Sequence, residues 1–247
     1  MSQVIHETAQ IGDGSDTGHF VVIGENVRIG EDCHIGHHVV IHPDTRMGDR
    51  VIVEDHAVIG KPPTRSTAMA NTSALELQPA AIASGARLGV GVVIYRGATL
   101  EEDTFIADYA AVREEAQVGS GTVIGRGAAV ENRVQIGAGC KIESGAFIAA
   151  LSVIEDGCFI APEVTVTNDR FLGRTADRAE HYKGITIRKG GRVGANATLL
   201  PGLTIADDGV AGAGSVVTRD IPSRQISFGA PAEVRGDVPE DQLLENQ

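Results

Sequence analysis

The sequence predicts an all-β protein whose chain winds into a parallel β-solenoid, and three observations support this. An aliphatic residue stands at every sixth position of residues 82–166, without exception. A second set of small or β-branched residues follows these positions by four, as Ala86 and Val92 do. The remaining positions are rich in Gly, Asp, Asn and Glu, which favour turns. A period of six fits neither a helix nor one long alternating strand, so it describes a repeated unit.

The spacing also predicts the shape of that unit. The small residue and the next aliphatic residue lie two apart, so both side chains of a short strand point the same way, into a narrow core. A chain that bends after every hexapeptide closes a triangular coil after three of them. Coils then stack about 4.8 Å apart and pair as parallel strands, which places residues eighteen apart above one another.

Composition and charge suit this fold and narrow the range of partners. The chain has 247 residues, no Trp and 4% aromatic residues, as expected for a thin prism filled by Val, Ile, Ala, Cys and Thr. The formal net charge of −12 argues against nucleic acid or an anionic membrane as the main partner. We find no signal peptide and no apolar run long enough to span a membrane, so we expect a cytoplasmic protein.

The three cysteines fit the same pattern. Cys33, Cys140 and Cys158 all occupy the small inward position of the repeat. We therefore expect buried thiols that act as small hydrophobic residues, not a disulfide or a metal site.

The phase of the repeat divides the chain into a solenoid and a tail. Residues 5–59 are already in phase, with Thr17 as the one exception, and phase returns at residues 187–217. We expect a β-helix of about ten coils over residues 1–221, and a cap and tail over 222–247 that includes a short terminal helix. Two excursions interrupt it, at about 61–81 and 168–186, and the first has room for a short helical turn.

The second excursion carries a local positive charge on an acidic protein. Residues 170–192 hold seven Lys or Arg and two acidic residues, Asp177 and Glu180. Such an island suits an anionic small molecule, since phosphates need paired cations; a solvated loop that keeps the protein soluble explains it equally well. The basic residues are Arg170, Arg174, Arg178, Lys183, Arg188, Lys189 and Arg192.

Four motifs in the C-terminal third resemble a known family. Residues 167–170 read Thr-Asn-Asp-Arg, and residues 194–202 read Gly-Ala-Asn-Ala-Thr-Leu-Leu-Pro-Gly. Residues 212–220 read Gly-Ala-Gly-Ser-Val-Val-Thr-Arg-Asp, and residues 229–232 read Gly-Ala-Pro-Ala. The repeat resembles the hexapeptide-repeat acyltransferase superfamily, and these motifs resemble its nucleotide-sugar N-acetyltransferases, which act on UDP- or dTDP-linked amino sugars.

The resemblance implies a fold, a reaction and an assembly. It implies a left-handed β-helix, which is an exception to the right-handed crossover rule. It also implies transfer of an acetyl group from acetyl-CoA to the amino group of a nucleotide-linked sugar, without a metal. Family members are trimers with sites between neighbouring prisms, so we expect a homotrimer.

Carried over residue by residue, the resemblance names a candidate site. Asn168 falls on the family's active-site Asn, while Asp169, Arg170 and Arg174 are candidates for binding the substrate. Small residues that let the backbone flank the pantetheine arm of CoA are expected on coil corners, at Gly194, Ala195, Ala211 and Ala213. Candidate partners of the CoA phosphates are Lys189, Arg192, Arg219 and Arg235.

Several departures from the family pattern leave the acceptor open. Ala149 and Ala150 stand where the family often has Tyr and an acid that meet the sugar nucleotide, Gly173 replaces a common Pro, and Glu233 replaces a frequent base. The N-terminal coils and the first excursion look more like the lipid A acyltransferases. An acyl-ACP- or CoA-dependent acyltransferase on another sugar or small acceptor, and a scaffold without catalysis, therefore remain alternatives.

The histidines raise two further hypotheses. His19 and His37 are eighteen apart, as are His38 and His56, so each pair should stack one coil apart at outward corners. Stacked histidines can bind a metal, as in hexapeptide-repeat carbonic anhydrases, so a metal-dependent lyase of that type is a further alternative, although a third ligand is not evident. His181 lies alone in the basic excursion, where it is a candidate general base or simply a polar loop residue.

Overall fold

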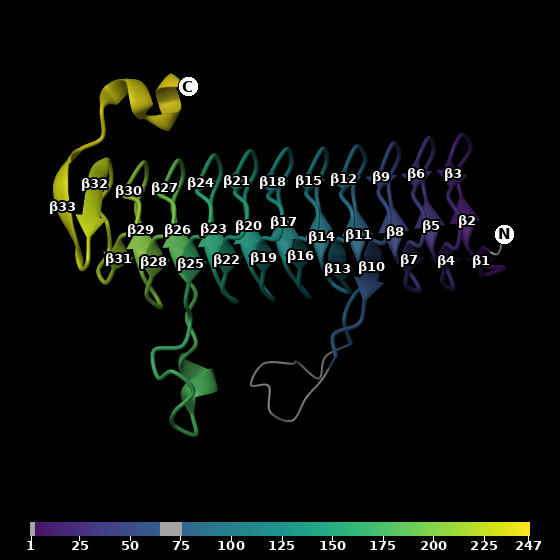
Figure 1. Cartoon of the computed structure of the whole chain (residues 1–247), viewed down its shortest axis with the longest axis horizontal. Coiled ribbons are helices and arrows are strands. Elements are labelled where there is room, and N and C mark those ends of the chain that lie inside the picture. The colour runs from purple at the N-terminus through teal and green to yellow at the C-terminus, as the bar shows by residue number, and fades with distance from the viewer. Residues whose placement is uncertain (1–2, 65–75) are drawn as a thin grey trace.

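The computed structural model describes residues 3–64 and 76–247 and shows a single long β-solenoid (Figure 1). Its short strands form three sheets with 11, 10 and 12 strands, here named sheets A, B and C. Every third strand belongs to the same sheet, so one coil contributes one strand to each sheet. The predicted all-β parallel β-helix is therefore confirmed.

Sheet A consists of β1 (Val4–Ile5), β4 (Val22–Ile23), β7 (Val40–Ile41), β10 (Val58–Lys61), β13 (Val93–Tyr95), β16 (Ala111–Val112), β19 (Ala129–Val130), β22 (Phe147–Ile148), β25 (Thr165–Val166), β28 (Thr198–Leu199) and β31 (Val216–Val217). Sheet B consists of β2 (Gln10–Ile11), β5 (Arg28–Ile29), β8 (Arg46–Met47), β11 (Ala81–Ile82), β14 (Thr99–Leu100), β17 (Gln117–Val118), β20 (Gln135–Ile136), β23 (Val153–Ile154), β26 (Thr186–Ile187) and β29 (Thr204–Ile205).

Sheet C consists of β3 (Asp16–Thr17), β6 (His34–Ile35), β9 (Ile52–Val53), β12 (Arg87–Leu88), β15 (Phe105–Ile106), β18 (Val123–Ile124), β21 (Lys141–Ile142), β24 (Phe159–Ile160), β27 (Arg192–Val193), β30 (Val210–Ala211), β32 (Gln225–Gly229) and β33 (Ala232–Asp237). All pairings are parallel except that of β32 with β33, which form an antiparallel hairpin at the C-terminal end.

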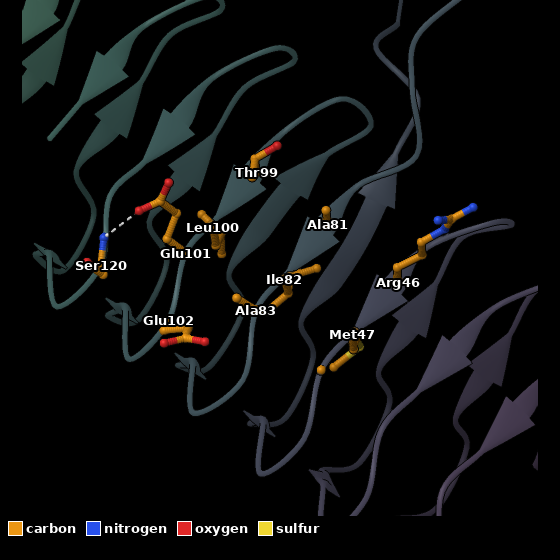
Figure 2. A pocket seen from close by; sticks show the side chains of 11 residues that line it. Arg46, Met47, Ala81, Ile82, Ala83, Thr99, Leu100, Glu101, Glu102 and Ser120 are labelled. Carbon is orange, nitrogen blue, oxygen red and sulfur yellow. Dashed lines mark hydrogen bonds between the residues drawn. The ribbon is translucent and has the colours of Figure 1, made fainter. Parts of the chain in front are cut away.

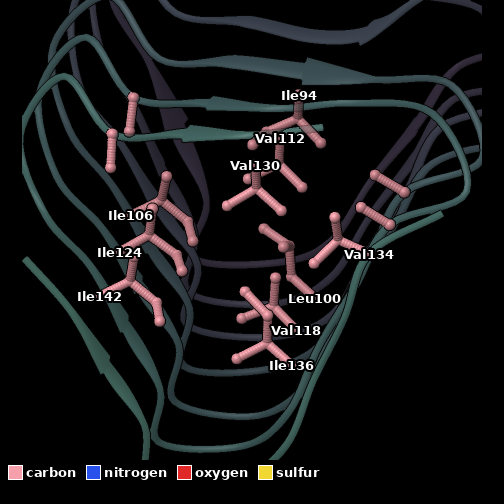
Figure 3. Packing of buried hydrophobic residues seen from close by; sticks show 14 of the residues in the cluster. Ile94, Leu100, Ile106, Val112, Val118, Ile124, Val130, Val134, Ile136 and Ile142 are labelled. Atoms are coloured by element: carbon pink, nitrogen blue, oxygen red, sulfur yellow. The ribbon is translucent and has the colours of Figure 1, made fainter. Parts of the chain in front are cut away.

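The register follows the predicted repeat. Ile94 pairs with Val112, which pairs with Val130, so equivalent residues one coil apart lie above one another. The aliphatic residues point inward and form three stacked columns, one for each sheet (Figure 3). Ile5 and Ile11 are exposed in the N-terminal coil, but beyond it the burial is almost complete, with Ile94, Ile124 and Val130 all at 0% exposure. Hydrophobic burial along the prism therefore stabilises the solenoid. The other residue of each two-residue strand faces outward and contributes little to the core.

This packing predicts the effect of a single core truncation. Replacing Ile124 with alanine should lower the free energy of unfolding by about 2–5 kcal/mol, because a fully buried side chain leaves a cavity that the stacked coils cannot fill. Val123 precedes it in β18 and faces outward, so Val123→Ala is the matched control and should cost less than about 1 kcal/mol. Denaturant unfolding of both variants measures the difference. Equal losses would contradict this assignment of the core face.

The C-terminal end is more structured than the sequence indicated. The solenoid has slightly more turns than the ten expected, because hairpin β32–β33 extends sheet C where a cap was predicted. The expected terminal helix is two short 3-10 helices, η2 (Glu240–Gln242) and η3 (Leu244–Asn246). Leu243 is buried and the Leu244 amide donates to Asp208 Oδ1 at 2.9 Å, so this tail folds back against the solenoid.

Two excursions leave the solenoid on the same side (Figure 1). One lies between β10 and β11, and the other, which contains the 3-10 helix η1 (Arg178–His181), lies between β25 and β26. Both therefore depart from the turn that leads from sheet A to sheet B. The helical turn expected in the first excursion falls largely on residues 65–75, outside the described residues.

Cys33, Cys140 and Cys158 are buried free thiols, as predicted. Among the described residues, no helix has the length and apolarity needed to cross a membrane.

Candidate functional site

The predicted catalytic residue Asn168 lies at the A/B corner, which we define as the turns leading from sheet A to sheet B. It follows β25, and the Lys183 amide donates to its carbonyl oxygen at 3.1 Å, closing the neck of the second excursion. The preceding Thr167 is held by its hydroxyl, which donates to the Leu199 carbonyl oxygen at 2.9 Å. The backbone of Asn168 is thus fixed, while its half-buried side-chain amide bonds to no other described residue.

The residues that follow Asn168 organise the excursion itself. The two carboxylate oxygens of Asp169 accept from the Phe171 amide at 2.8 Å and the Gly173 amide at 2.9 Å. These backbone bonds, led by the one from Gly173, lower the pKa of Asp169. Both oxygens are therefore engaged by the loop. Arg170 and Arg174 are exposed and form no ion pair with a described residue.

His181 is oriented by its neighbours in the same excursion. Its Nε2 lies 3.2 Å from Asp177 Oδ2, and its ring meets the edge of Phe171 with centroids 5.6 Å apart. The hydrogen bond with His181 lowers the pKa of Asp177. This pairing resembles the way a carboxylate fixes the tautomer of a catalytic imidazole. His181 stands two residues before Lys183 in the sequence. It therefore lies on the segment that returns to Asn168.

The small residues predicted to flank CoA lie at a different corner. Gly194, Ala195 and Ala213 occupy the C/A corner, the turns leading from sheet C to sheet A. The Gly214 amide donates to the Ala195 carbonyl oxygen at 2.8 Å, so these turns stack directly. A Cβ on Gly194 would lie 2.4 Å from the Ala213 nitrogen, which explains why the tightest of these positions is glycine. The corner therefore presents backbone with very little side chain.

One of the predicted corner residues is placed differently. Ala211 is not at a corner, because it is the inward residue of β30 and is completely buried. Its position follows from the repeat, since residue 211 has the inward aliphatic phase. Its side chain cannot contact a cofactor on the surface.

The four cations predicted for the CoA phosphates do not converge. Lys189 lies between sheets C and B, Arg192 projects from β27 on sheet C, and Arg219 lies at the A/B corner. Arg235, on β33, stacks over the Phe228 ring at 5.8 Å from its centroid and pairs with Glu233 at 3.1 Å.

Of these cations, Arg235 is connected to the small-residue corner. A Cβ on Gly212 would lie 2.7 Å from Phe228 Cβ, and Gly212 continues the column that begins at Gly194. The Arg192 side chain is engaged elsewhere, and Lys189 lies at another corner and is held there through its backbone. Arg192 donates to Gln242 at 3.3 Å, and the Lys189 amide donates to Glu155 at 3.1 Å.

The two halves of the predicted site thus lie on opposite edges of sheet A. Asn168 and the second excursion border one edge, and the corner of Gly194, Ala195 and Ala213 borders the other. Between them, the first residue of each strand of sheet A faces outward and is uncharged, and Lys61, at the end of β10, is a charged exception. From the N-terminal end, these first residues are Val4, Val22, Val40, Val58, Val93, Ala111, Ala129, Phe147, Thr165, Thr198 and Val216.

Two hollows lie away from both halves, on sheet B. The larger has a volume of about 490 Å³ and is lined by strand residues such as Thr99 and Leu100, with Glu101 at its rim (Figure 2). Glu101 accepts from the Ser120 amide at 3.1 Å there. The second, of about 400 Å³, shares Glu101 and reaches Lys189. No other predicted site residue lines either hollow.

The histidine pairs stack as predicted, at the C/A corner of the N-terminal coils. His19 and His37 have ring centroids 5.1 Å apart, and His38 and His56 have centroids 4.9 Å apart. His37 Nδ1 already accepts from the His19 backbone amide at 2.8 Å. Within residues 3–64 and 76–247, no group of three or more His, Cys, Asp or Glu is arranged to hold a metal.

Sequence reasoning missed a buried charged cluster at the A/B corner. Arg113 donates to Glu114 through two nitrogens, both at 2.9 Å, and to Glu131 at 3.2 Å. The available signal was the spacing, since Glu131 follows Arg113 by eighteen residues and must stack beside it. The polar composition of the corners predicts solvated side chains there and does not indicate this cluster.

Comparisons with known proteins agree with this architecture. A family model described as bacterial transferase hexapeptide, six repeats, matches residues 26–61 and 115–150. The chain therefore carries hexapeptide repeats and resembles the hexapeptide-repeat acyltransferases. The solved structure of Arabidopsis UDP-N-acetylglucosamine acyltransferase matches 96% of this chain and 73% of that chain, with a TM-score of 0.52 and 19% identity. That likeness shows the fold.

Among curated proteins, the similarity is local. The chain is 41% identical over 59 residues to a dTDP-3-amino-3,6-dideoxy-alpha-D-galactopyranose 3-N-acetyltransferase of Aneurinibacillus thermoaerophilus, covering 24% of this chain and 31% of that protein. It is 44% identical over 50 residues to the galactoside O-acetyltransferase of Escherichia coli, covering 20% of this chain and 25% of that protein. The chain thus spans less than a third of the length of these relatives.

Proposed function

We propose that this protein transfers the acetyl group of acetyl-CoA to the amino group of a nucleotide-linked amino sugar. The observation that carries the proposal is Asn168, whose backbone is fixed at the A/B corner while its amide is left without a described partner. Similarity to an amino-sugar N-acetyltransferase supports the reaction class. The stacked small residues at the C/A corner suit the thin pantetheine arm.

In the proposed mechanism, the neutral amine of the sugar attacks the thioester carbonyl carbon. The Asn168 amide can accept from the amine or donate to a polar group of the acceptor, and so it aims the nucleophile. Backbone N–H groups at the coil corners stabilise the oxyanion as the C–N bond forms. The C–S bond then breaks, and the amine proton leaves through His181, oriented by Asp177, or goes to the departing thiolate.

The active site is proposed to lie between subunits of a homotrimer. In one chain, Asn168 and the small-residue corner are separated by the width of sheet A, so neither half is complete alone. The largely uncharged outer face of that sheet is a natural packing surface for a second copy. Packing there would bring the A/B corner of one subunit to the C/A corner of its neighbour.

Product analysis tests the reaction directly. The protein should acetylate at least one member of a panel of UDP- and dTDP-linked amino sugars in the presence of acetyl-CoA, giving a product heavier by one acetyl group in mass spectrometry. Acetyl-CoA should also raise the melting temperature, because a ligand that binds only the native state stabilises it. No thermal shift would favour a scaffold, and acetylation only of neutral sugars would favour an O-acetyltransferase.

The position of Arg235 predicts which cation binds the CoA phosphates. Arg235→Ala should weaken acetyl-CoA binding by about 1.5–3 kcal/mol, the range for hydrogen bonds to charged groups. Lys189→Ala is the control, because Lys189 lies at another corner. The affinity of this variant for acetyl-CoA should stay within about twofold of wild type. Isothermal titration calorimetry measures both. If only Lys189→Ala lost affinity for acetyl-CoA, the phosphates would instead bind at the corner that leads from sheet B to sheet C.

A further inference from the structure

The charged cluster at the A/B corner lies between the two excursions. The Arg113 guanidinium binds Glu114 in bidentate fashion and also contacts Glu131. Its Cζ lies 5.1 Å from the centroid of the Tyr95 ring, which also carries Lys61 Nζ at 4.6 Å. These side chains come from successive coils, so they form a row along the solenoid axis.

The burial of this row is unusual for a solenoid corner. Glu114 is 2% exposed, and the side chains of Arg113 and Glu131 are 18% and 25% exposed. Removal from water raises the pKa of Glu131, and the nearby Glu114 raises it further. In many proteins, the free energy lost by removing charges from water exceeds the free energy gained by pairing them. A corner that served only folding would therefore gain no stability from these charges. Buried ionisable groups of this kind concentrate at binding sites.

Asn132 provides a second, independent observation. It is 7% exposed, its side-chain amide nitrogen still reaches the surface, and the amide bonds to no other residue in the described part of the chain. An amide that is held in a nearly buried side chain, with its nitrogen open at the surface, can both donate to and accept from a ligand. The register places Asn132 directly above Glu114, because β16 pairs with β19 through Val112 and Val130.

The same register aligns this cluster with the proposed catalytic residue. Asn132, Ala150 and Asn168 occupy equivalent positions in three successive coils, as the pairing of β19, β22 and β25 shows. Asn132 and Asn168 are thus about 10 Å apart along the axis, a span that a substituted sugar ring can bridge. Ala149 and Ala150 lie between them and offer no polar side-chain atom. A ligand held at Asn168 therefore meets its next polar partners at Glu131 and Asn132.

The charges of the row indicate what kind of group binds there. Arg113 is already paired with two carboxylates, so it is not free to bind a phosphate. Glu131 contacts Arg113 through Oε2 alone, which leaves Oε1 to accept a hydrogen bond. A carboxylate oxygen beside a free amide suits hydroxyl groups, which can both donate and accept.

We propose that Glu131 and Asn132 bind the hydroxyl groups of the acceptor's sugar ring while Asn168 holds its amine. This assignment rests on the proposed acetyl transfer and adds the acceptor site to it. It also explains how the chain can use a sugar acceptor although alanines occupy positions 149 and 150. Recognition is moved one coil toward the N-terminus, to the row that Arg113 organises.

Calorimetry with dTDP-3-amino-3,6-dideoxygalactose as the probe, and dTDP alone as the sugar-free reference, tests the proposal. Glu131→Gln and Asn132→Ala should each raise the Kd of the sugar nucleotide about tenfold, the loss expected for one good hydrogen bond. The Kd of dTDP should change less than about twofold in the same variants. In turnover assays, KM for the sugar should rise while KM for acetyl-CoA stays constant.

Glu115→Gln is the matched control. Glu115 lies one residue from the row and pairs with Arg133 at 2.9 Å on the surface, so the same charge is removed without touching the cluster. Its sugar affinity should equal that of wild type. Asn132→Ala should fold like the wild type, because the Asn132 amide bonds to no other residue in the described part of the chain. Melting temperatures report whether each variant is folded.

The possible outcomes separate this proposal from the proposed function. Equal sugar affinity in all three variants and wild type would overturn it, as would an equal loss in Glu115→Gln. Loss of dTDP affinity in step with the sugar would also overturn it, because the contact would then be with the nucleotide. A wild-type protein that binds acetyl-CoA but binds the sugar nucleotide no better than dTDP would refute the sugar site while acyl transfer stands. Failure to bind acetyl-CoA would instead refute the proposed function.

Discussion

Replacing Asn168 with alanine is expected to lower kcat about 100-fold, the usual cost of losing one preorganised polar group at a reacting centre. The side-chain amide has no described partner to support, and the bonds of Thr167 and Lys183 hold the backbone in place. The loss should therefore be in turnover and not in stability. Steady-state rates at saturating acceptor, with melting temperatures of both proteins, measure the two effects separately.

Two further variants make this expectation specific. Asn168→Asp keeps the size of the side chain but removes its donor, so it should be nearly as slow if the amide donates during the reaction. His181→Ala tests the base: a true general base contributes about 100- to 10,000-fold, so a variant within about threefold of wild type would exclude it. An Asn168→Ala enzyme with normal kcat would overturn the site, because it is the residue on which the mechanism depends.

The inward face of this protein could be predicted because the repeat reports it directly. Ile94, Ile124 and Val130 stand at sixth positions, and all are fully buried. The same phase explains the one misplaced residue, since Ala211 belongs to the inward series and is buried in β30. The small size of Ala211 suggested a corner, but its place in the six-residue repeat determines that it faces inward.

The arrangement of the site was harder to predict, for two physical reasons. Asn168 and Gly194 are close in sequence, yet they lie on different corners, because two strands, β26 and β27, separate them along the chain. Counting strands would have revealed this. The burial of Glu114 and Asn132 depends on which side chains surround the corner in three dimensions. A sequence pattern that marks corners as polar does not distinguish solvated corners from buried ones.

A mixed trimer should recover activity that its parent trimers lack, if the active site is shared between neighbours. Asn168→Ala removes the half at the A/B corner. Ala213→Trp covers the exposed small residue at the C/A corner and should block the CoA arm without disturbing the core. Each variant alone should have almost no activity, because every site in its trimer contains one damaged half.

Co-expression of the two variants with different tags, followed by purification through both tags, yields the mixed trimers. Every mixed trimer contains two copies of one variant and one of the other, so one of its three sites combines two intact halves, and about a third of wild-type activity should return. The control is a mixture of the two homotrimers that never exchange subunits, which should stay inactive. If mixed trimers are as inactive as their parents, both halves of the site lie within one chain, and sheet A does not carry the catalytic interface.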